Sequence, residues 1–178
     1  MKTLILGGVR SGKSRTAAAL AAGTALEVCL IATATALDEE MAARIAAHRA
    51  ERPSGWTVIE EPIELGAALR ASAARGRVLI VDCLTLWLTN LLLDPHAETL
   101  PRQRAALLET LASADGDIIL VGNEVGLGIV PISELARRFA DEAGSLHQQI
   151  ALLCERLLFM VAGVPLRVRG PPIAGEMT

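Results

Sequence analysis

The chain has 178 residues and a formal net charge of −3, and 52% of its residues are hydrophobic whereas only 2% are aromatic. These values exclude a disordered chain and predict one globular domain with a core of aliphatic side chains. They also argue against nucleic acid and anionic membranes as partners. A negatively charged protein does not attract phosphate groups in bulk, and few aromatic rings are available to stack on bases.

Strands and helices are expected to alternate along the chain. Short apolar runs predict strands over Thr3–Leu6, Val28–Ala32, Thr57–Ile59, Arg77–Val81, Asp117–Gly122, Leu157–Val161 and Leu166–Arg169. Periodic apolar spacing predicts helices over Lys13–Ala22, Glu39–Glu51, Pro62–Ala74, Leu84–Leu93, Pro101–Ser113 and Ser133–Glu155. The expected N-caps of the second and the last helix are Asp38 and Ser133.

This alternation predicts an α/β fold with a mostly parallel central sheet flanked by helices, because parallel neighbours need a crossover between them. The all-apolar segments 78–81 and 118–121 are expected at the centre of the sheet, where both faces are covered. The last two strands are close enough in sequence for a hairpin, so one antiparallel edge strand is expected. We expect residues 1–170 to form a single domain and residues 171–178 to be a flexible tail.

The three cysteines, Cys29, Cys83 and Cys154, are far apart and form no C-x-x-C pair, so neither a zinc site nor a disulfide framework is indicated. Free thiols fit a reducing cytoplasm, and no signal peptide precedes the first strand. We therefore expect a cytoplasmic protein. The apolar stretch 78–93 is interrupted by polar residues such as Asp82, which favours a strand and a helix over a transmembrane segment.

The run Gly7-Gly8-Val9-Arg10-Ser11-Gly12-Lys13-Ser14 fits G-x-x-x-x-G-K-[ST], the phosphate-binding loop. It stands between a predicted strand and a predicted helix, the context that such a loop requires. The glycines let backbone N–H groups turn toward a phosphate, and the helix N-terminus adds partial positive charge. We expect Lys13 to bind the β- and γ-phosphates and Ser14 to bind Mg²⁺.

Polar residues follow several other predicted strands, and ligands of open α/β sheets bind at the carboxyl ends of the strands. Asp82 ends an apolar strand, which is where phosphate-loop proteins hold Mg²⁺; an ordinary carboxylate in a turn is the alternative. Glu124 follows the fifth strand. It either acts near the reacting group or caps its own loop, and the sequence pattern leaves both open.

The predicted helix over Glu39–Glu51 places His48 on about the same face as Ile45. Arg44 and Arg52 lie four residues before and after His48, so a neutral imidazole that attacks a phosphorus is one interpretation. The spacing alone favours the other interpretation, a surface helix whose basic residues are solvated and balanced by nearby acids.

Five segments and the closing hairpin give the chain a resemblance to one known family over nearly its whole length. The segments are GGVRSGKS at 7–14, IATATALDEEMAARIAAHRAERP at 31–53, VDCLTLWLTNLL at 81–92, NEVGLGIVP at 123–131 and LARRFADEAGSLHQQIA at 135–151. The chain resembles the bifunctional adenosylcobinamide kinase / adenosylcobinamide-phosphate guanylyltransferases of cobalamin biosynthesis. HRAERP and NEVGLGIVP are far more specific to this family than the phosphate loop.

The resemblance implies a RecA-like P-loop fold, a homotrimer and two reactions. In the first, ATP or GTP phosphorylates the aminopropanol hydroxyl of adenosylcobinamide. In the second, His48 takes GMP from GTP with release of pyrophosphate and passes it to adenosylcobinamide phosphate, giving adenosylcobinamide-GDP.

The resemblance also implies site residues. Lys13 and His48 would be catalytic, and Ser14 and Asp82 would hold the cofactor Mg²⁺. Some relatives carry glutamate where this chain has Asp82, and either carboxylate can hold the metal. The implied nucleotide contacts are Gly7, Gly8, Val9, Arg10, Ser11, Gly12, Lys13, Ser14, Ala32, Thr33, Ala34, Arg49, Ala50, Glu51, Arg52, Glu60 and Asp82.

Two alternatives use fewer of these features. A plain small-molecule kinase would use Lys13, Ser14 and Asp82 without a covalent step, and would keep full activity after His48→Ala. A RecA-like nucleotide switch would hydrolyse nucleotide slowly and have no small acceptor. Neither alternative needs HRAERP or NEVGLGIVP, so the resemblance disfavours both.

Overall fold

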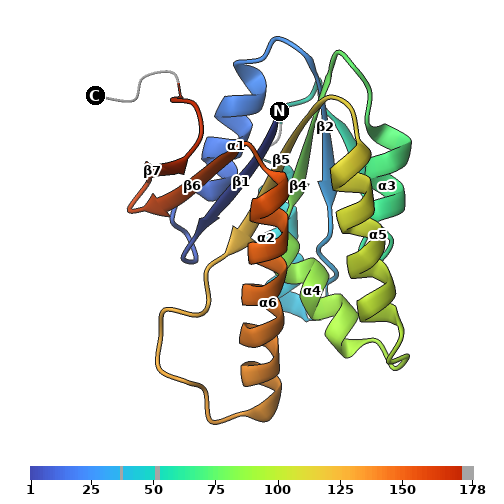
Figure 1. Ribbon diagram of the computed structural model, residues 1–178, viewed down its shortest axis with the longest axis vertical. Helices are drawn as coiled ribbons and strands as arrows, with labels where there is room; N and C mark the ends of the chain where they lie inside the picture. Colours follow the sequence, from blue (N-terminus) through green and yellow to red (C-terminus); the bar gives the residue numbers. More distant parts are fainter. Residues whose placement is uncertain (37, 51–52, 174–178) are drawn as a thin grey trace.

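The computed structural model describes residues 1–36, 38–50 and 53–173, and of residue 44 it describes the backbone alone. Within these residues seven strands form one sheet, flanked by helices (Figure 1). In chain order the elements are β1 (Lys2–Gly7), α1 (Lys13–Ala22), β2 (Glu27–Ala32), α2 (Glu39–Ala50), β3 (Thr57–Glu60), α3 (Leu65–Ser72), β4 (Arg77–Asp82), α4 (Leu84–Leu93), α5 (Thr99–Ser113), β5 (Asp117–Asn123), α6 (Glu134–Leu153), β6 (Arg156–Val161) and β7 (Val164–Arg169).

The strand order is β3-β2-β4-β5-β1-β6-β7, and every neighbouring pair is parallel except β6 and β7. The predicted parallel sheet with one antiparallel edge strand from a C-terminal hairpin is therefore confirmed. The apolar segments 78–81 and 118–121 lie buried in β4 and β5 near the centre of the sheet, also as predicted. Because β1 lies beside β5, the carboxyl ends of β1, β4 and β5 meet at one edge.

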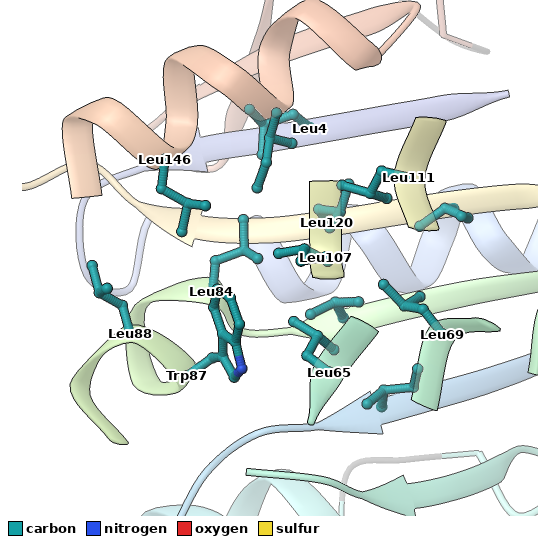
Figure 2. Packing of buried hydrophobic residues seen from close by; sticks show 14 of the residues in the cluster. Leu4, Leu65, Leu69, Leu84, Trp87, Leu88, Leu107, Leu111, Leu120 and Leu146 are labelled. Carbon is teal, nitrogen blue, oxygen red and sulfur yellow. The ribbon is translucent and has the colours of Figure 1, made fainter. Parts of the chain in front are cut away.

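Different helices cover the two faces of the sheet. Side chains from α3, α4, α5 and α6 converge on one face, where Leu65, Trp87 and Leu146 are buried together (Figure 2). On the other face the buried helical residues are Ala17 and Ala21 of α1. Small side chains let α1 pack closely on the strands, so the helix that follows the phosphate loop is held firmly against the sheet.

The closing hairpin turns earlier than its sequence predicts. β7 begins at Val164 instead of Leu166, because the turn consists of Ala162 and Gly163, whose φ angles are 49° and 84°. Two consecutive positive φ angles are typical of the two-residue turns that match the twist of a hairpin.

Two helix starts also differ from the predictions. α3 begins at Leu65 and not at residue 62, because the carboxylate of Glu61 accepts a hydrogen bond from the Glu64 backbone N–H at 2.7 Å and holds the preceding residues in a turn. α5 begins at Thr99, two residues before the predicted start, and Pro101 lies in its first turn. Proline is tolerated there because the N–H that it lacks would have no helical partner.

Both predicted N-caps are confirmed. The Asp38 carboxylate accepts a hydrogen bond from the Met41 backbone N–H at 2.7 Å at the start of α2. The Ser133 hydroxyl accepts one from the Ala136 backbone N–H at 3.4 Å at the start of α6. Each cap satisfies a backbone donor that the first helical turn leaves without a partner.

The first residues after the hairpin lie against the sheet. Arg156 of β6 donates hydrogen bonds to the backbone carbonyls of Pro171 and Pro172, at 3.1 and 3.4 Å, and Ile173 packs against the core on the α1 face. Residues 171–173 of the expected tail therefore contact the sheet, and residues 174–178 lie outside the described residues. Cys29, Cys83 and Cys154 are free thiols, as predicted. No helix in the described part of the chain has the length and apolar character that a membrane span requires.

Candidate active site

The phosphate-binding motif forms the turn between β1 and α1. Lys13 is buried, and its Nζ donates hydrogen bonds to the Gly8 carbonyl at 2.6 Å and to the Ser11 hydroxyl at 3.4 Å. Burial lowers the pKa of Lys13, whereas the neighbouring Cys83 and Asp82 raise it. The ammonium group therefore lies inside the loop and close to the end of β4.

Close backbone packing fixes the shape of this loop. A Cβ added at Gly7 would lie 2.7 Å from the Met160 carbonyl oxygen, and one added at Gly12, where φ is 95°, would lie 3.2 Å from the Cα of Gly163. The Gly163 N–H donates a hydrogen bond to the Ser11 carbonyl at 3.0 Å. The β6–β7 hairpin thus supports the loop from one side, and both glycines are required by this contact.

Thr33 connects the ends of β2 and β4. Its hydroxyl donates a hydrogen bond to the Cys83 carbonyl at 2.7 Å and accepts one from the Cys83 N–H at 3.0 Å. Its backbone N–H donates to the Asp82 carbonyl at 3.2 Å, and Asn90 of α4 donates to its carbonyl at 2.8 Å. The structure therefore brings Ala32, Thr33 and Asp82, three of the implied nucleotide contacts, to one position at the edge of the sheet.

Ser14 and Asp82 offer the oxygen ligands that Mg²⁺ prefers, and both are half-buried. The charge of Asp82 acts on Lys13, so the carboxylate and the phosphate loop share one edge of the sheet. Among residues 1–36, 38–50 and 53–173, no group of three or more His, Cys, Asp or Glu could hold a metal ion by itself. The oxygen donors of Ser14 and Asp82 are the kind that would hold a magnesium ion together with nucleotide phosphates.

α2 is an exposed helix beside this edge. None of its described side chains is buried, and Ile45 is half-buried whereas His48 is exposed. Arg49 forms an ion pair with Glu60 at the end of β3, where the two side chains are 53% and 59% exposed. The structure brings together two more of the implied nucleotide contacts, while His48 has no hydrogen bond or ion pair within the part of the chain that the structure describes.

Glu51 and Arg52 lie outside the described residues, as does the side chain of Arg44. Ala50 is the exposed last residue of α2, and Ala34 is half-buried directly after Thr33.

Two supporting residues at this edge have no signal in the sequence. Thr85 of α4 accepts a hydrogen bond from the Asn123 N–H at 2.7 Å, and His147 of α6 lies buried behind β5. A Cβ added at Gly122 would come within 2.8 Å of the His147 Nε2, so only glycine leaves room for this imidazole. Burial lowers the pKa of His147, and Glu124 opposes this shift. Both contacts join residues that are far apart in the chain, so no local spacing reveals them.

The arrangement suits reactions of nucleotide phosphates. A buried lysine lies inside a glycine loop, oxygen ligands for Mg²⁺ stand beside it, and an exposed imidazole lies on a neighbouring helix. Such a set can neutralise charge on phosphates and offer a nitrogen nucleophile.

Comparisons with known proteins found close relatives. The profile of the family CobU, described as "Cobinamide kinase / cobinamide phosphate guanyltransferase", matches residues 3–168. The bifunctional adenosylcobalamin biosynthesis protein CobP of Pseudomonas aeruginosa is 58% identical over 173 residues, a match that covers 97% of this chain and 100% of the relative. The bifunctional adenosylcobalamin biosynthesis protein CobU of Escherichia coli is 37% identical over 182 residues, covering 95% of this chain and 100% of the relative.

A solved structure shows the fold. The assembled ATPase EscN of the type III secretion system of enteropathogenic Escherichia coli matches with a TM-score of 0.54 and 12% identity, covering 90% of this chain and 43% of that chain. At this identity the likeness concerns the fold alone. The expected RecA-like P-loop fold is confirmed.

Proposed function

The chain belongs to the cobinamide kinase / cobinamide phosphate guanyltransferase family, and on this premise we propose how its residues divide the two reactions. It is an enzyme of cobalamin biosynthesis that phosphorylates cobinamide and transfers a guanylyl group to cobinamide phosphate. In the proposed scheme the acceptor is adenosylcobinamide, ATP or GTP donates the phosphate, and the final products are adenosylcobinamide-GDP and pyrophosphate. A cytoplasmic location is part of the proposal, and the three free thiols support it.

The phosphate loop serves both reactions in this scheme. The backbone N–H groups of residues 7–14 hold the phosphates, and Lys13 leaves the Gly8 carbonyl to bind the β- and γ-phosphates. The position of the ammonium inside the loop supports this role. Ser14 and Asp82 hold Mg²⁺, which supplies positive charge to the phosphates when it is bound.

His48 is the proposed nucleophile of the second reaction. Its imidazole nitrogen bonds to the α-phosphorus of GTP while the bond to the β-phosphate breaks and pyrophosphate leaves. The resulting phosphoramidate is a high-energy link, so it can pass GMP to the acceptor phosphate. The adjacent ion pair between Arg49 and Glu60 is the observation that supports this role best, because it places the end of α2 at the same edge of the sheet as the phosphate loop.

The test is a covalent-labelling experiment on the whole chain with Mg²⁺ and GTP that is radioactive at the α-phosphate. We expect label on the wild-type protein that survives base and is lost in acid, and no label on His48→Ala. The matched control is His96→Ala, which removes an exposed histidine between α4 and α5 and should leave labelling unchanged.

The same His48→Ala protein should still phosphorylate cobinamide, because the first reaction needs no histidine nucleophile. Absence of label on the wild-type protein would contradict the covalent step. A plain phosphate-loop kinase would then be the better account of the site.

We propose in addition that the active form is a homotrimer. Large apolar side chains are exposed in the connection between β5 and α6, which extends beyond the sheet in Figure 1. Ile129 is 97% exposed and Ile132 is 99% exposed. Such a surface is unusual for a monomer and favours contact with another copy of the chain.

Light scattering during size-exclusion chromatography tests this assembly. The wild-type protein should elute with the mass of three chains, and Ile132→Asp should weaken or abolish the trimer. Leu152→Asp is the matched control, because Leu152 is also exposed but lies near the other end of α6. A monomeric wild-type protein would contradict the proposal.

A further inference from the structure

Three of the carboxylates at the carboxyl edge of the sheet have a partner or an assigned role. Glu60 forms an ion pair with α2, and Glu61 accepts hydrogen bonds from two backbone N–H groups before α3. Asp82 is the proposed metal ligand. Glu124 has no assigned role, and its carboxylate has no cation partner among the described residues but accepts one hydrogen bond, from the Gly126 N–H.

Glu124 is fixed directly beside the phosphate loop. Its backbone N–H donates a hydrogen bond to the Gly7 carbonyl at 3.0 Å, and the preceding Asn123 is paired in register with Gly7. The Lys13 ammonium is bound one residue further along the loop, at the Gly8 carbonyl. Glu124 therefore lies at the entrance of the proposed phosphate site, where its backbone is hydrogen-bonded to Gly7, the first glycine of the loop.

The carboxylate of Glu124 is held in place, and only one of its oxygens has a hydrogen-bond partner among the described residues. It is half-buried, and its Oε1 accepts one hydrogen bond from the Gly126 N–H at 2.5 Å. Behind it lies His147, which is buried against Gly122. Because burial favours the neutral form of this imidazole, His147 does not cancel the negative charge of the carboxylate.

We propose that Glu124 is the general base of the kinase reaction, an inference that rests on the proposed function of this site. The hydroxyl oxygen of the acceptor bonds to the γ-phosphorus, and its proton passes to a carboxylate oxygen of Glu124. The bond between the γ-phosphorus and the bridging oxygen breaks, and its electron pair leaves with the nucleoside diphosphate. In the guanylyl step the nucleophile is an imidazole nitrogen, which does not need this carboxylate.

Measuring both reactions therefore distinguishes a general base, which acts in phosphorylation alone, from a residue that only supports the structure of the site. Glu124→Gln keeps the size of the side chain and an oxygen that can accept from the Gly126 N–H, but it cannot take a proton. We expect the rate of cobinamide phosphorylation to fall about 10²–10⁴-fold, the range that general-base catalysis contributes. Covalent labelling by GTP should stay within about twofold of wild type. The phosphorylation rate of Glu124→Asp should lie between those of wild type and Glu124→Gln, because aspartate keeps the carboxylate base on a shorter side chain.

Binding of a fluorescent GTP analogue, measured on every variant, reports folding and an intact loop independently of either reaction. Glu134→Gln, an exposed glutamate in the first turn of α6, is the matched control and should leave both reactions unchanged. If Glu124→Gln phosphorylates cobinamide within about threefold of wild type, the base is another group. If phosphorylation, GTP labelling and GTP binding fall together, Glu124 only supports the loop. If wild type carries no label, the covalent step fails, whereas phosphorylation and GTP binding still decide the role of Glu124.

Discussion

The two halves of the candidate site are built in opposite ways. In the phosphate loop, Lys13 is 7% exposed and Gly7 has no room for a Cβ beside Met160. On α2, by contrast, Arg49 is 53% exposed and its partner Glu60 belongs to the edge strand β3. In one half Lys13 is enclosed between the sheet, α1 and the hairpin, although residues 8–10 at the tip of the loop are exposed. The other half stands in solvent.

The difference teaches how one nucleotide site can serve two reactions. In the proposed scheme both reactions hold phosphates in the same way, which suits a rigid loop, whereas the histidine nucleophile acts in only one of them. An exposed ion pair such as Arg49–Glu60 contributes only about 0–1 kcal/mol, so little free energy fixes the position of α2. We therefore expect α2 to move toward the α-phosphorus when GTP is bound.

The largest effect should come from the enclosed half. Lys13→Ala should slow both phosphorylation and guanylylation by about 10²–10³-fold or more, because both reactions lose the same positive charge at the phosphates. Lys2→Ala, at the opposite end of β1, is the control for loss of a lysine. Steady-state rates of the two reactions check this, and survival of either one within about tenfold would show that the loop is not shared.

A smaller and selective effect is expected from the exposed half. Arg49→Ala should reduce guanylylation about 10–100-fold, which corresponds to the roughly 1.5–3 kcal/mol of a hydrogen bond to a charged group. Phosphorylation and the free energy of unfolding should change little. Arg75→Ala, which removes an arginine that is 89% exposed and paired with Asp115, is the matched control. Equal losses in both reactions would contradict the division between the two halves.

Hydrogen exchange compares the two halves without mutation. Amides of α2 should exchange at least about tenfold faster than those of α1, because α2 has no buried side chain among its described residues whereas α1 is anchored by Ala17 and Ala21. Addition of GTP and Mg²⁺ should slow exchange in α2 more than in α1. Equal exchange in the two helices, or an α2 that does not respond to GTP, would rule out the proposed movement.

The smallest effect concerns the pH dependence of stability, and it belongs to the enclosed half. Burial lowers the pKa of His147 below its ordinary 6.5, so the unfolded chain binds a proton at a higher pH than the folded chain does. The free energy of unfolding should therefore fall as the pH falls through 6.5 toward the lower pKa of the folded state.

His147→Asn should remove part of that dependence. Urea unfolding at about pH 7.5 and about pH 5 measures it for both proteins. If the free energy of unfolding of the variant falls between these two pH values as much as that of wild type, groups other than His147 cause the pH dependence. The same substitution should leave the exchange rates of α2 unaffected.

Much of the fold follows from the sequence, because its signals are local. The apolar segments of β4 and β5 predict the centre of the sheet, and the caps Asp38 and Ser133 are located correctly from residue type alone. The errors lie at boundaries where one side chain overrides the periodic pattern, as Glu61 does before α3.

The candidate site is predicted less completely, for a physical reason. The phosphate loop is a contiguous motif, so its residues are visible in sequence. Met160 and Gly163 of the hairpin support the loop, whereas Thr85 and His147 contact the end of β5 beside it. These contacts exist only after the chain has folded. The proposed role of His48 is likewise not evident from spacing, which favours a solvated surface helix, and the exposed position of α2 agrees with that interpretation.

The contact between the hairpin turn and the phosphate loop has a consequence for synthesis of the chain. The loop occupies residues 7–14, but Met160 and Gly163, which support it from the side, emerge from the ribosome much later than the loop does. A growing chain therefore contains the phosphate-loop sequence well before that loop can adopt its folded conformation. Chains cut short before β6 should therefore fail to retain nucleotide, because the loop lacks the hairpin that supports it.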